Sequence, residues 1–415
     1  MSVSKECVLI VGGGLAGLAC ANRLHAAGAA PVILESSDAP GGRVRTDVVD
    51  GFLLDRGFQV FLDAYPEAGA LLDKQTLDLR PFKPGALVFD EGGLRRMMDV
   101  FREPRHLVAS AVAPIGSVAD KMRMALLKWR SSRVSLEEIA THEDLTTETY
   151  LQRAGFSSGM IDGFFRSFYG GVFLERDLRT SSRMFEFTFR MFSQGSATLP
   201  ARGMGEIPRQ LASRLPEGTI RLGENVTEVR AGRVMLESGE QLTGRAVVVA
   251  TNATSAAKLV PGLSGAEPAW RSVTCLHFAA SRSPMGEAII ALNGSGSGLV
   301  NNICVPSDVA PSYAPMGKSL ISISVLGMPE PVDLASRVVA ELESWFGKEV
   351  NEWRHLRTER IERALPEQAP NVGMAGPGYW EHGGLYVCGD HQWSASIEGA
   401  IISGLRTADA IVRQS

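Results

Sequence analysis

The sequence has few cysteines, and none of them forms a recognisable metal-ligand or disulfide pattern. Five cysteines are far apart in a chain of 415 residues, without a Cys-x-x-Cys pair: Cys7, Cys20, Cys275, Cys304 and Cys388. Most lie in apolar runs typical of strands, so we expect buried, reduced thiols rather than disulfides or a metal site. The seven histidines are scattered, and the sequence contains neither a Ser-His-Asp set nor a His-Glu-x-x-His motif.

Long hydrophobic runs and an excess of one charge are also missing. The uncharged stretch from Leu107 to Ala119 is too short for a transmembrane helix and contains Pro114. No basic region followed by an apolar run is visible at the start, so no signal peptide is predicted. A net charge of −4 gives no reason to expect nucleic acid as a partner. We therefore expect a cytoplasmic protein of two or three domains, with membrane association left open.

The first 35 residues contain a strand, a glycine turn, a helix and a second strand. The apolar run Val8–Val11 leads into Gly12–Gly17, and helix-forming residues follow from Leu18 to Ala27. A second apolar run, Pro31–Leu34, is closed by Glu35. This order and spacing predict the βαβ unit that binds dinucleotides, although a glycine-rich βα turn of the ordinary kind is the alternative.

Each residue type in this unit has a physical reason. Gly12 allows the tight turn, Gly14 lets the backbone approach a pyrophosphate, and Gly17 lets the helix pack on the strand. The helix N-terminus offers unpaired N–H groups and the positive end of its dipole to an anion. Glu35 is placed to accept hydrogen bonds from a ribose diol.

A second glycine pair, Gly41-Gly42, and Arg43 follow soon after the acid. They suit a loop that lies against the same pyrophosphate, with a guanidinium reaching it. Residues 51–61 are then predicted as strand, turn and strand. Here, in Phe58–Phe61 and Ala64–Pro66, the sequence resembles the superfamily of FAD-dependent amine oxidases, protoporphyrinogen oxidases and phytoene desaturases, with the plant-type desaturases most similar. The resemblance implies non-covalently bound FAD, with a covalent link through a cysteine as the less favoured alternative.

The resemblance extends to the middle and the end of the chain. Leu199–Ile207 resembles the family's Pro-x-x-Gly-Met turn beside the flavin, and the residue matching Val226 holds the adenine through its backbone. Ser394–Gly404 resembles the family's C-terminal motif. The resemblance implies that Asp390, in the turn before this motif, binds the ribityl chain and that the helix start at Gly399-Ala400 points its dipole at the flavin pyrimidine. The expected cofactor-binding residues are therefore Gly12, Gly14, Leu15, Ala16, Gly17, Glu35, Ser36, Gly41, Gly42, Arg43, Gly57, Phe58, Val226, Gly389, Asp390, Glu398, Gly399 and Ala400.

The predicted fold class is α/β, with an α+β substrate part. Residues 1–63, 195–260 and 355–415 are expected to form a discontinuous, Rossmann-like FAD-binding domain. Residues 64–194 and 261–354 would form an interleaved substrate-binding domain, mainly helical over 97–190. Gly294–Gly298 lies between two strand runs with no helix after it, so a hairpin turn is predicted there. No second dinucleotide unit is visible, so no NAD(P)H site is expected.

Two segments of the substrate part leave alternatives open. Residues 102–133 carry seven basic side chains against two acidic ones, and Val118, Met122, Ala125 and Trp129 recur at helical spacing. Such a stretch lies either on an anionic membrane surface or as a solvated helical face over a core. The nine aromatic residues of 164–192 form either plain core or the wall of an apolar pocket.

The resemblance implies hydride removal by flavin from a large apolar molecule, such as a polyene or a tetrapyrrole, with oxygen, a quinone or a protein as electron acceptor. An amine oxidase is the second hypothesis, with Tyr379, Trp380 and Trp393 as candidates for its aromatic cage. A flavoprotein without net redox turnover, as an isomerase or a binding protein, is the third. No catalytic acid or base can be named. His391 is expected to be a hydrogen-bonded structural histidine rather than a base.

Overall fold

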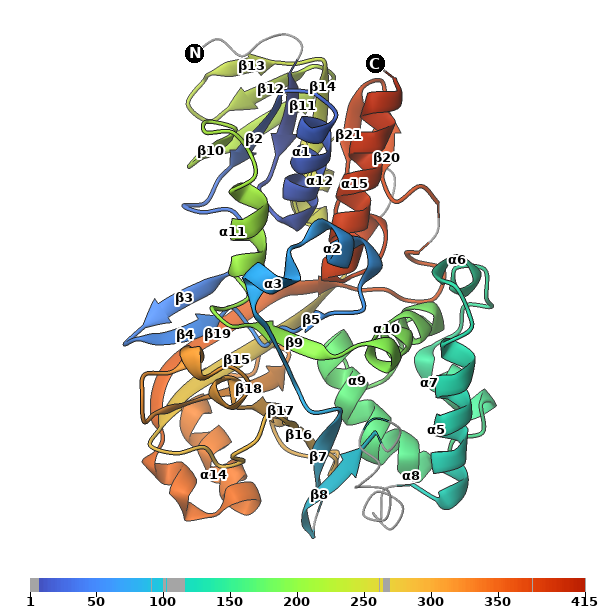
Figure 1. Cartoon of the computed structure of the whole chain (residues 1–415), viewed down its shortest axis with the longest axis vertical. Helices are drawn as coiled ribbons and strands as arrows, with labels where there is room; N and C mark the ends of the chain where they lie inside the picture. The colour runs from blue at the N-terminus through green and yellow to red at the C-terminus, as the bar shows by residue number, and fades with distance from the viewer. Residues whose placement is uncertain are drawn as a thin grey trace.

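The computed structural model describes residues 7–90, 92–99, 102, 116–260, 262–263, 269–374 and 376–414. It shows an α/β protein built on two large sheets (Figure 1). The sheet at the top of the view carries the N-terminal strand and the C-terminal helix, while the second sheet lies below it, beside a group of helices. The prediction of the fold class is confirmed.

The upper sheet has six strands in the order β10-β2-β1-β14-β21-β20. Their bounds are β10 (Ile220–Leu222), β2 (Pro31–Glu35), β1 (Val8–Val11), β14 (Ala246–Val249), β21 (Leu385–Val387) and β20 (Trp380–His382). All neighbours pair in parallel except β20 with β21. The strands of this sheet therefore come from segments at both ends and in the middle of the chain.

Both faces of this sheet are covered, which explains its nearly unbroken apolar strands. Val8 and Ile10 pack into a core that includes α1 (Leu15–Ala26) and α15 (Ile397–Arg413). Leu9 and Val11 pack on the other side against the three-stranded sheet of β11 (Val226–Arg230), β12 (Arg233–Leu236) and β13 (Gln241–Thr243). α12 (Ala253–Leu259) follows β14.

The lower sheet has seven strands in the order β19-β15-β18-β17-β16-β7-β8. Their bounds are β19 (Arg354–Pro366), β15 (Trp270–Ala280), β18 (Ser319–Leu326), β17 (Val300–Cys304), β16 (Ile290–Asn293), β7 (Gly85–Asp90) and β8 (Gly93–Met98). One face packs on α14 (Leu334–Phe346) through Leu276, Ile323 and Val338, among others. β19 falls in the segment predicted for the FAD-binding domain, yet it pairs along β15, so the seven-stranded sheet includes residues up to 366.

The glycine-rich segment Gly294–Gly298 connects β16 to β17, which pair as antiparallel neighbours. The prediction of a hairpin turn, rather than a second dinucleotide site, is confirmed. Asn293 supports the turn, because its side-chain Nδ2 donates to the carbonyls of Ser297 (2.7 Å) and Val300 (2.8 Å).

Short elements connect the two sheets. β3 (Thr46–Val49) and β4 (Phe52–Asp55) form a hairpin, and β9 (Ala197–Pro200) pairs with both β5 (Phe61–Leu62) and β6 (Leu79–Pro81). The connecting helices are α2 (Pro66–Leu71), α3 (Lys74–Leu77), α11 (Glu206–Ala212) and α13 (Pro306–Val309), with the 3-10 turns η3 (Pro311–Tyr313), η4 (Lys348–Glu352) and η5 (Asp390–Gln392).

Apart from their connections, helices fill residues 118–190 of the region predicted to be mainly helical, whereas residues 97–98 belong to β8. They are α5 (Val118–Ser131), α6 (Leu136–Ile139), α7 (Thr147–Arg153), α8 (Ser158–Met160), the π-helical turn η2 (Ile161–Phe165), α9 (Arg166–Phe173) and α10 (Ser182–Gln194). The helical pattern predicted from Leu107 to Ile115 lies outside the described residues. No helix in the described part of the chain is both long and apolar enough to span a bilayer.

The aromatic residues of 164–192 pack largely on one another. Phe165, Tyr169, Phe173, Phe185 and Phe187 are all at most 4% exposed. Tyr169 lies 4.7 Å from Phe185 and 5.2 Å from Phe173, measured between ring centroids. These buried rings support the core alternative.

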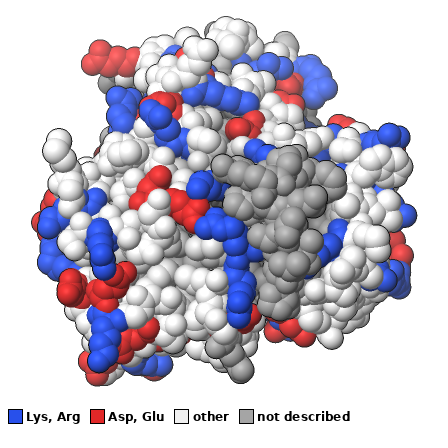
Figure 2. Space-filling view, turned by 60° about the horizontal axis from the view of Figure 1, so that its bottom comes forward, with Lys and Arg blue, Asp and Glu red and all other residues white. Residues whose placement is uncertain are grey.

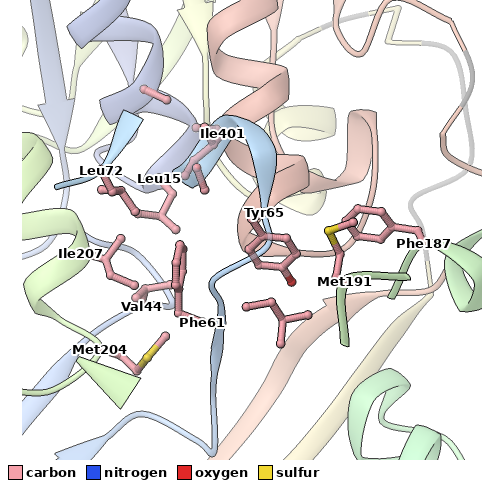
Figure 3. Close-up of a cluster of buried hydrophobic side chains, with 14 of the residues drawn as sticks. Leu15, Val44, Phe61, Tyr65, Leu72, Phe187, Met191, Met204, Ile207 and Ile401 are labelled. Carbon is pink, nitrogen blue, oxygen red and sulfur yellow. The ribbon is translucent and has the colours of Figure 1, made fainter. Parts of the chain in front are cut away.

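A cluster between α1, α11, α15 and α10 joins the helical region to the upper sheet (Figure 3). Tyr65 stacks on Phe187 there with ring centroids 6.0 Å apart, and Leu15, Ile207 and Ile401 complete it.

Candidate cofactor and substrate site

Three glycines in the turn after β1 differ in the space beside them: Gly12 and Gly17 are closely packed, whereas Gly14 is not. A Cβ on Gly12 would stand 2.9 Å from the carbonyl oxygen of Ala250, and Gly12 has a φ of +107°. A Cβ on Gly17 would collide with the carbonyl oxygen of Gly12, whereas a Cβ on Gly14 would meet no protein atom within 4 Å. Gly12 and Gly17 are therefore needed by the fold, while Gly14 borders a space at the N-terminus of α1.

The second glycine pair lies directly against the first. The amide of Gly41 donates to the carbonyl of Gly13 (2.8 Å), and Gly14 and Gly41 form a parallel bridge. A Cβ on Gly42 would be 3.4 Å from the Cα of Gly14. The loops that follow β1 and β2 thus meet in front of the first turn of α1, as the sequence predicted for one shared site.

Glu35 is oriented by two backbone amides. Its Oε2 accepts from the amide of Gly13 (2.6 Å) and its Oε1 from the amide of Ser37 (2.9 Å). The carboxylate is therefore held at the end of β2, beside the glycine turn. Carboxylate oxygens can accept further hydrogen bonds, so this arrangement suits a ribose diol. Ser36, next to it, is exposed.

Arg43 joins two predicted site residues that are far apart in sequence. Its Nη2 lies 2.7 Å from Oδ1 of Asp390, and its Nη1 donates to the carbonyl of Ala364 (2.9 Å). The guanidinium carbon is also 5.8 Å from the ring centroid of Trp270. The guanidinium of Arg43, which was expected at the pyrophosphate, therefore pairs with Asp390, just after β21. This ion pair brings the C-terminal segment to the site.

His391 departs from its expectation. Both ring nitrogens are buried without a hydrogen-bond partner, and the closest acid, Asp390, is 4.0 Å from Nδ1. The prediction of a hydrogen-bonded structural histidine is therefore wrong. Burial lowers the pKa of the imidazole, so it is neutral near pH 7 and keeps one donor and one acceptor. Buried polar groups are normally paired, so these orphaned nitrogens indicate a polar group beside Asp390.

The N-terminus of α15 is built from its own residues. Ser396 caps it by accepting from the amide of Gly399 (2.9 Å), and a Cβ on Gly399 would collide with the carbonyl oxygen of Ser394. Glu398, fully buried, accepts from the amides of Glu67 and Ala68, both at 2.8 Å. Its carboxylate therefore caps α2, and burial raises its pKa to about 7. The sequence had assigned Glu398 to the cofactor and had explained Gly399 by the flavin. In the structure Glu398 binds the amides of α2, and Gly399 packs against Ser394.

The remaining predicted cofactor residues lie around the same opening or on elements next to it. Leu15 and Ala16 form the buried first turn of α1, and Ala400 is partly buried in the first turn of α15. Val226 is the half-buried first residue of β11. Gly389, with a φ of +151°, donates from its amide to Oγ of Ser403 (2.9 Å).

Taken together, these features fit an extended dinucleotide. There is open space before Gly14, an oriented acid at Glu35, an arginine at position 43, and the orphaned nitrogens of His391. The two glycine loops and the start of η5 contribute backbone amides at strand ends, where phosphates are bound in this type of sheet.

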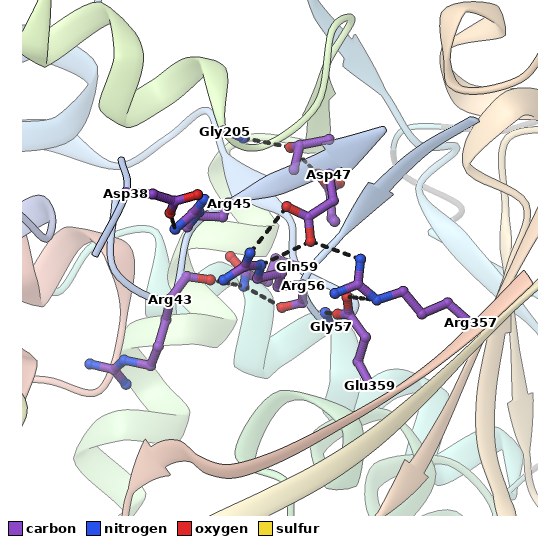
Figure 4. Close-up of polar contacts among 12 residues, drawn as sticks. Asp38, Arg43, Arg45, Asp47, Arg56, Gly57, Gln59, Gly205, Arg357 and Glu359 are labelled. Carbon is purple, nitrogen blue, oxygen red and sulfur yellow. Dashed lines mark hydrogen bonds and ion pairs between the residues drawn. The ribbon is translucent and has the colours of Figure 1, made fainter. Parts of the chain in front are cut away.

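The loop between β4 and β5, which contains Gly57 and Phe58, is fixed by charged side chains (Figure 4). Asp47 accepts from Arg56 through two bonds of 3.1 Å and from Arg357 at 3.0 Å. The amide of Gly57 donates to Glu359 (3.2 Å). Because Arg357 and Glu359 lie on β19, this network ties the loop to the lower sheet.

Sequence reasoning missed the polar face of the lower sheet. Cross-strand pairs place Cys275 beside Ser324, and His277 beside Ser322, on the face opposite Leu276. Asn302 pairs with Ser324 and extends the row to β17. All of these polar residues are buried, and Nδ1 of His277 and Nδ2 of Asn302 have no hydrogen-bond partner. Alternation of Cys, His and Ser with apolar residues along β15 and β18 was the available signal.

A small cavity separates His277 from the loop with Gly57 and Phe58. Asp55, Tyr313 and Ser322 also line it, and about 10 Å³ is open to the centre of a water molecule, which is room for one water. Oδ2 of Asp55 accepts from the Tyr313 hydroxyl (2.7 Å).

The titratable groups around this cavity are shifted in opposite directions. Burial raises the pKa of Asp55 to about 6, although hydrogen bonds from Thr46, Tyr313 and Met204 oppose the shift. Burial lowers the pKa of His277 to about 4. The cavity therefore brings Asp55, the last residue of β4, close to His277 of the lower sheet.

The family model for flavin containing amine oxidoreductases matches residues 15–412. The chain belongs to this family. It is an FAD-dependent oxidoreductase, and the open site at the two glycine loops fits its cofactor. The prediction of a superfamily of amine oxidases, protoporphyrinogen oxidases and phytoene desaturases is confirmed.

Curated relatives are similar to this chain over different shares of its length. 15-cis-phytoene desaturase of an Oncidium hybrid cultivar is 22% identical over 98% of this chain and 78% of that protein. Coproporphyrinogen III oxidase of Propionibacterium freudenreichii is 24% identical over 89% of this chain and 86% of that protein. Protoporphyrinogen oxidase 2 of Arabidopsis thaliana is 27% identical, over 41% of this chain and only 33% of that protein.

Solved structures of the family share the fold at low identity. A variant of putrescine oxidase superposes with a TM-score of 0.76 at 16% identity, over 99% of each chain. A putative protoporphyrinogen oxidase from Exiguobacterium sp. 255-15 gives 0.74 at 17% identity, over the full length of both chains.

The cysteines are buried, as the sequence predicted. This holds for Cys7, Cys20, Cys275, Cys304 and Cys388. Among the described residues, no group of three or more His, Cys, Asp or Glu side chains could hold a metal ion.

Proposed function

We propose that this oxidoreductase removes hydride equivalents from a large, mainly apolar molecule such as a polyene or a tetrapyrrole. The observation that carries the proposal is the pair of near-full-length matches to a phytoene desaturase and a coproporphyrinogen III oxidase. The family model covers amine oxidoreductases in general, and the similarity to putrescine oxidase itself is one of fold at 16% identity. The acceptor would be oxygen, a quinone or another protein, because the chain has a single glycine-rich βαβ unit.

The cofactor would be held without a covalent bond. The amides of the two glycine loops and the N-terminus of α1 would bind the pyrophosphate. Glu35 would bind the adenosine ribose, Val226 the adenine, and Asp390 and His391 the polar chain towards the flavin. Arg43 would neutralise charge beside Asp390. The bound flavin supplies the electron-accepting centre.

The chain's own residues would orient the substrate and exclude water. The loop of Gly57 and Phe58 lies between the cofactor site and the polar face of the lower sheet, so we infer that this face forms one wall of the substrate site. His277 is neutral near pH 7 and carries an unpartnered nitrogen, so it can donate or accept one hydrogen bond there. A purely hydrocarbon substrate would leave this nitrogen unpaired, which favours a substrate that carries polar groups.

The amine-oxidase alternative gains little from the candidate aromatic residues. Trp393 lies under the guanidinium of Arg406, 4.1 Å from the ring centroid, and a Cβ on Gly378 would touch its ring at 3.4 Å. Tyr379 pairs with Tyr386 at 6.3 Å. These contacts indicate that Trp393 packs against Arg406 and Gly378. They do not place Trp393 and Tyr379 opposite each other as the two walls of an aromatic cage.

The test is anaerobic reduction of the flavin, followed by its visible absorbance. We expect bleaching by a polyene in detergent or by a reduced tetrapyrrole, and none by NADH, NADPH or simple amines. Rapid bleaching by an amine alone would replace the proposal with an amine oxidase. Conversion of the substrate in the absence of any electron acceptor would instead favour an isomerase, that is, a flavoprotein without net redox turnover. Mass spectrometry of molecules extracted from the purified protein supplies the substrates to try.

Glu35→Ala sharpens the cofactor part of the proposal. Loss of hydrogen bonds to the ribose should weaken FAD binding by about 1–3 kcal/mol without removing it. Free flavin released on denaturation, measured against protein, reports the retained fraction. Flavin that stays with the precipitated protein would contradict non-covalent binding.

A substrate of this kind dissolves poorly in water. Peripheral contact with a lipid surface is therefore part of the proposal, with the basic stretch 102–133 as its carrier. Of that stretch, residue 102 and residues 116–133 are described, and Arg105 lies outside the described residues.

A further inference from the structure

An apolar stripe on α5 faces solvent instead of the core. Val118, Met122, Leu126 and Trp129 are 68, 64, 45 and 53% exposed, and their spacing of four, four and three residues places them on one helical face. Ten large hydrophobic side chains are strongly exposed in the described part of the chain, and the other six are each on a different element or loop. A contiguous stripe of this kind marks an interaction site, whereas single exposed residues are ordinary.

Buried polar contacts hold the stripe outward. Asp120 has no exposed surface, and its carboxylate accepts from the amide and hydroxyl of Ser117, both at 2.7 Å. It also accepts from the amide (2.8 Å) and hydroxyl (2.7 Å) of Ser157, at the start of α8. Arg190 of α10 donates to the carbonyl of Ser131 at the other end of the helix. Rotation of α5 to bury the stripe would break these bonds, so the exposure is built into the packing.

The same helix concentrates positive charge in an acidic protein. Residues 118–133 contain five basic side chains and one acidic one, a net charge of +4, whereas the whole chain carries −4. Two of the five are in ion pairs, Arg123 with Asp120 (3.6 Å) and Lys128 with Asp99. Arg133 lies over the ring of Trp129, 4.3 Å from its centroid, so a basic group borders the apolar stripe. Figure 2 shows basic and acidic side chains scattered among uncharged ones on the face that it views.

The positive charge of α5 indicates whether a second copy of the chain or a lipid surface binds this face. A second copy docked by twofold symmetry would set one +4 helix against another, which is repulsive. An anionic bilayer surface offers negative charge together with an apolar layer a few ångströms below it, and basic amphipathic helices with Trp at their border bind there.

We propose that α5 docks this protein on anionic lipid bilayers, with Met122, Leu126 and Trp129 entering the acyl boundary and Arg130 and Arg133 contacting lipid headgroups. The inference rests on the proposed function only for its purpose, delivery of a poorly soluble substrate. Binding itself is independent of turnover and is measured without substrate.

The experiment is co-sedimentation of the FAD-loaded protein with vesicles. One set contains phosphatidylcholine alone, and the other contains phosphatidylcholine and phosphatidylserine, each at low and high salt. We expect binding to the anionic set, weakened by salt. Arg130→Glu with Arg133→Glu should lower the partition coefficient by at least roughly thirtyfold, since each basic residue near an anionic surface contributes a factor of about five. Met122→Ser with Leu126→Ser and Trp129→Ser should also lower it.

Matched variants elsewhere control for composition and folding. Val332→Ser with Met316→Ser removes apolar groups that are more exposed still, and Arg337→Glu with Arg413→Glu reverses exposed charges on α14 and α15. Both should bind as the parent protein does. Flavin content checks that every variant is folded.

Three results would overturn the inference. They are equal binding by the α5 variants and the controls, absence of binding to anionic vesicles, and conversion of an oligomer to a monomer by the serine variant, which would make the stripe a protein interface. Oxidation of an apolar substrate in detergent by a protein that ignores vesicles would leave the proposed function intact while removing this inference.

Discussion

The two large sheets place their chemistry in different positions. In the six-stranded sheet, the polar residues lie at or just beyond the strand ends, as with Glu35 and Asp390. In the seven-stranded sheet they lie within the strands, on one face, as with His277 and Ser322.

The difference follows from what covers each sheet. A parallel sheet packed on both faces has no room for polar side chains within its strands, so only the strand ends can bind a charged ligand. The antiparallel part of the lower sheet buries apolar residues on α14 and turns alternate residues towards the loop of Gly57. The first arrangement suits a cofactor bound through backbone amides, and the second carries the side chains that we propose face the substrate.

Substitutions in the first glycine turn should have the largest effect. Gly17→Ala places a methyl group on the backbone carbonyl of Gly12, so we expect loss of both FAD and cooperative folding. Gly14 has a φ of −71°, which any residue adopts, and its Cβ would meet open space. Gly14→Val should therefore keep the fold but lose FAD. Thermal unfolding and the ratio of flavin to protein separate the two, and a yellow Gly14→Val protein would contradict the cofactor site.

Two adjacent residues of β15 test the two faces of the lower sheet. Leu276→Ala leaves a cavity under α14 and should lower the free energy of unfolding by about 2–5 kcal/mol. His277→Leu removes Nδ1, which is buried without a partner, together with the weak contact of Nε2 with Sγ of Cys275 (3.6 Å), so stability should stay the same or rise by about 1 kcal/mol. Substrate-dependent flavin reduction should nevertheless slow in His277→Leu. Denaturant unfolding that shows equal losses for both variants would mean that His277 serves only the fold.

Asp55, between the two sheets, should make stability depend on pH. Its pKa is about 6 in the folded protein against 3.8 in the unfolded chain, so the folded state binds the proton more tightly. The resulting stabilisation is present below about pH 4 and is lost as pH rises through 6, a change of roughly 3 kcal/mol. Asp55→Asn should remove this component, whereas Asp50→Asn on the same hairpin should keep it. Parallel pH profiles of unfolding for all three proteins would contradict the assignment.

The glycine turn of the lower sheet should tolerate change best. Gly296 has a φ of +73°, and a Cβ there would meet no atom within 4 Å. Gly296→Ala should cost only about 1–2 kcal/mol of backbone strain and leave FAD retention unchanged. Loss of flavin from this variant would show that the two glycine-rich turns are not distinct in function.

Much of the upper sheet could be read from the sequence because its signals are local. Val8–Val11, the glycine turn and Pro31–Glu35 follow each other within 30 residues, and each carries its own physical reason. The hairpin at Gly294–Gly298 was predicted for the same reason, since the absence of a following helix is visible in the sequence.

Assignments that depend on distant partners were less secure. Glu398 belongs to a motif near the C-terminus, yet its carboxylate caps α2, more than 300 residues earlier. β19 is placed by its pairing with β15, which no local pattern announces. His391 lacks the partner that an isolated sequence would assign to it.

The sequence by itself determined the dinucleotide unit, the α/β class and the family, because period, glycine spacing and the acid at a strand end act over a few residues. Only the tertiary structure decided which face of α5 meets solvent and which face of β15 carries His277 to the loop of Gly57. A helical or strand period defines two faces but does not say what covers each. In this protein, the hydrogen bonds of the buried Asp120 fix the exposed face of α5, and packing on α14 fixes the apolar face of β15. Both depend on contacts between segments that are distant in the chain.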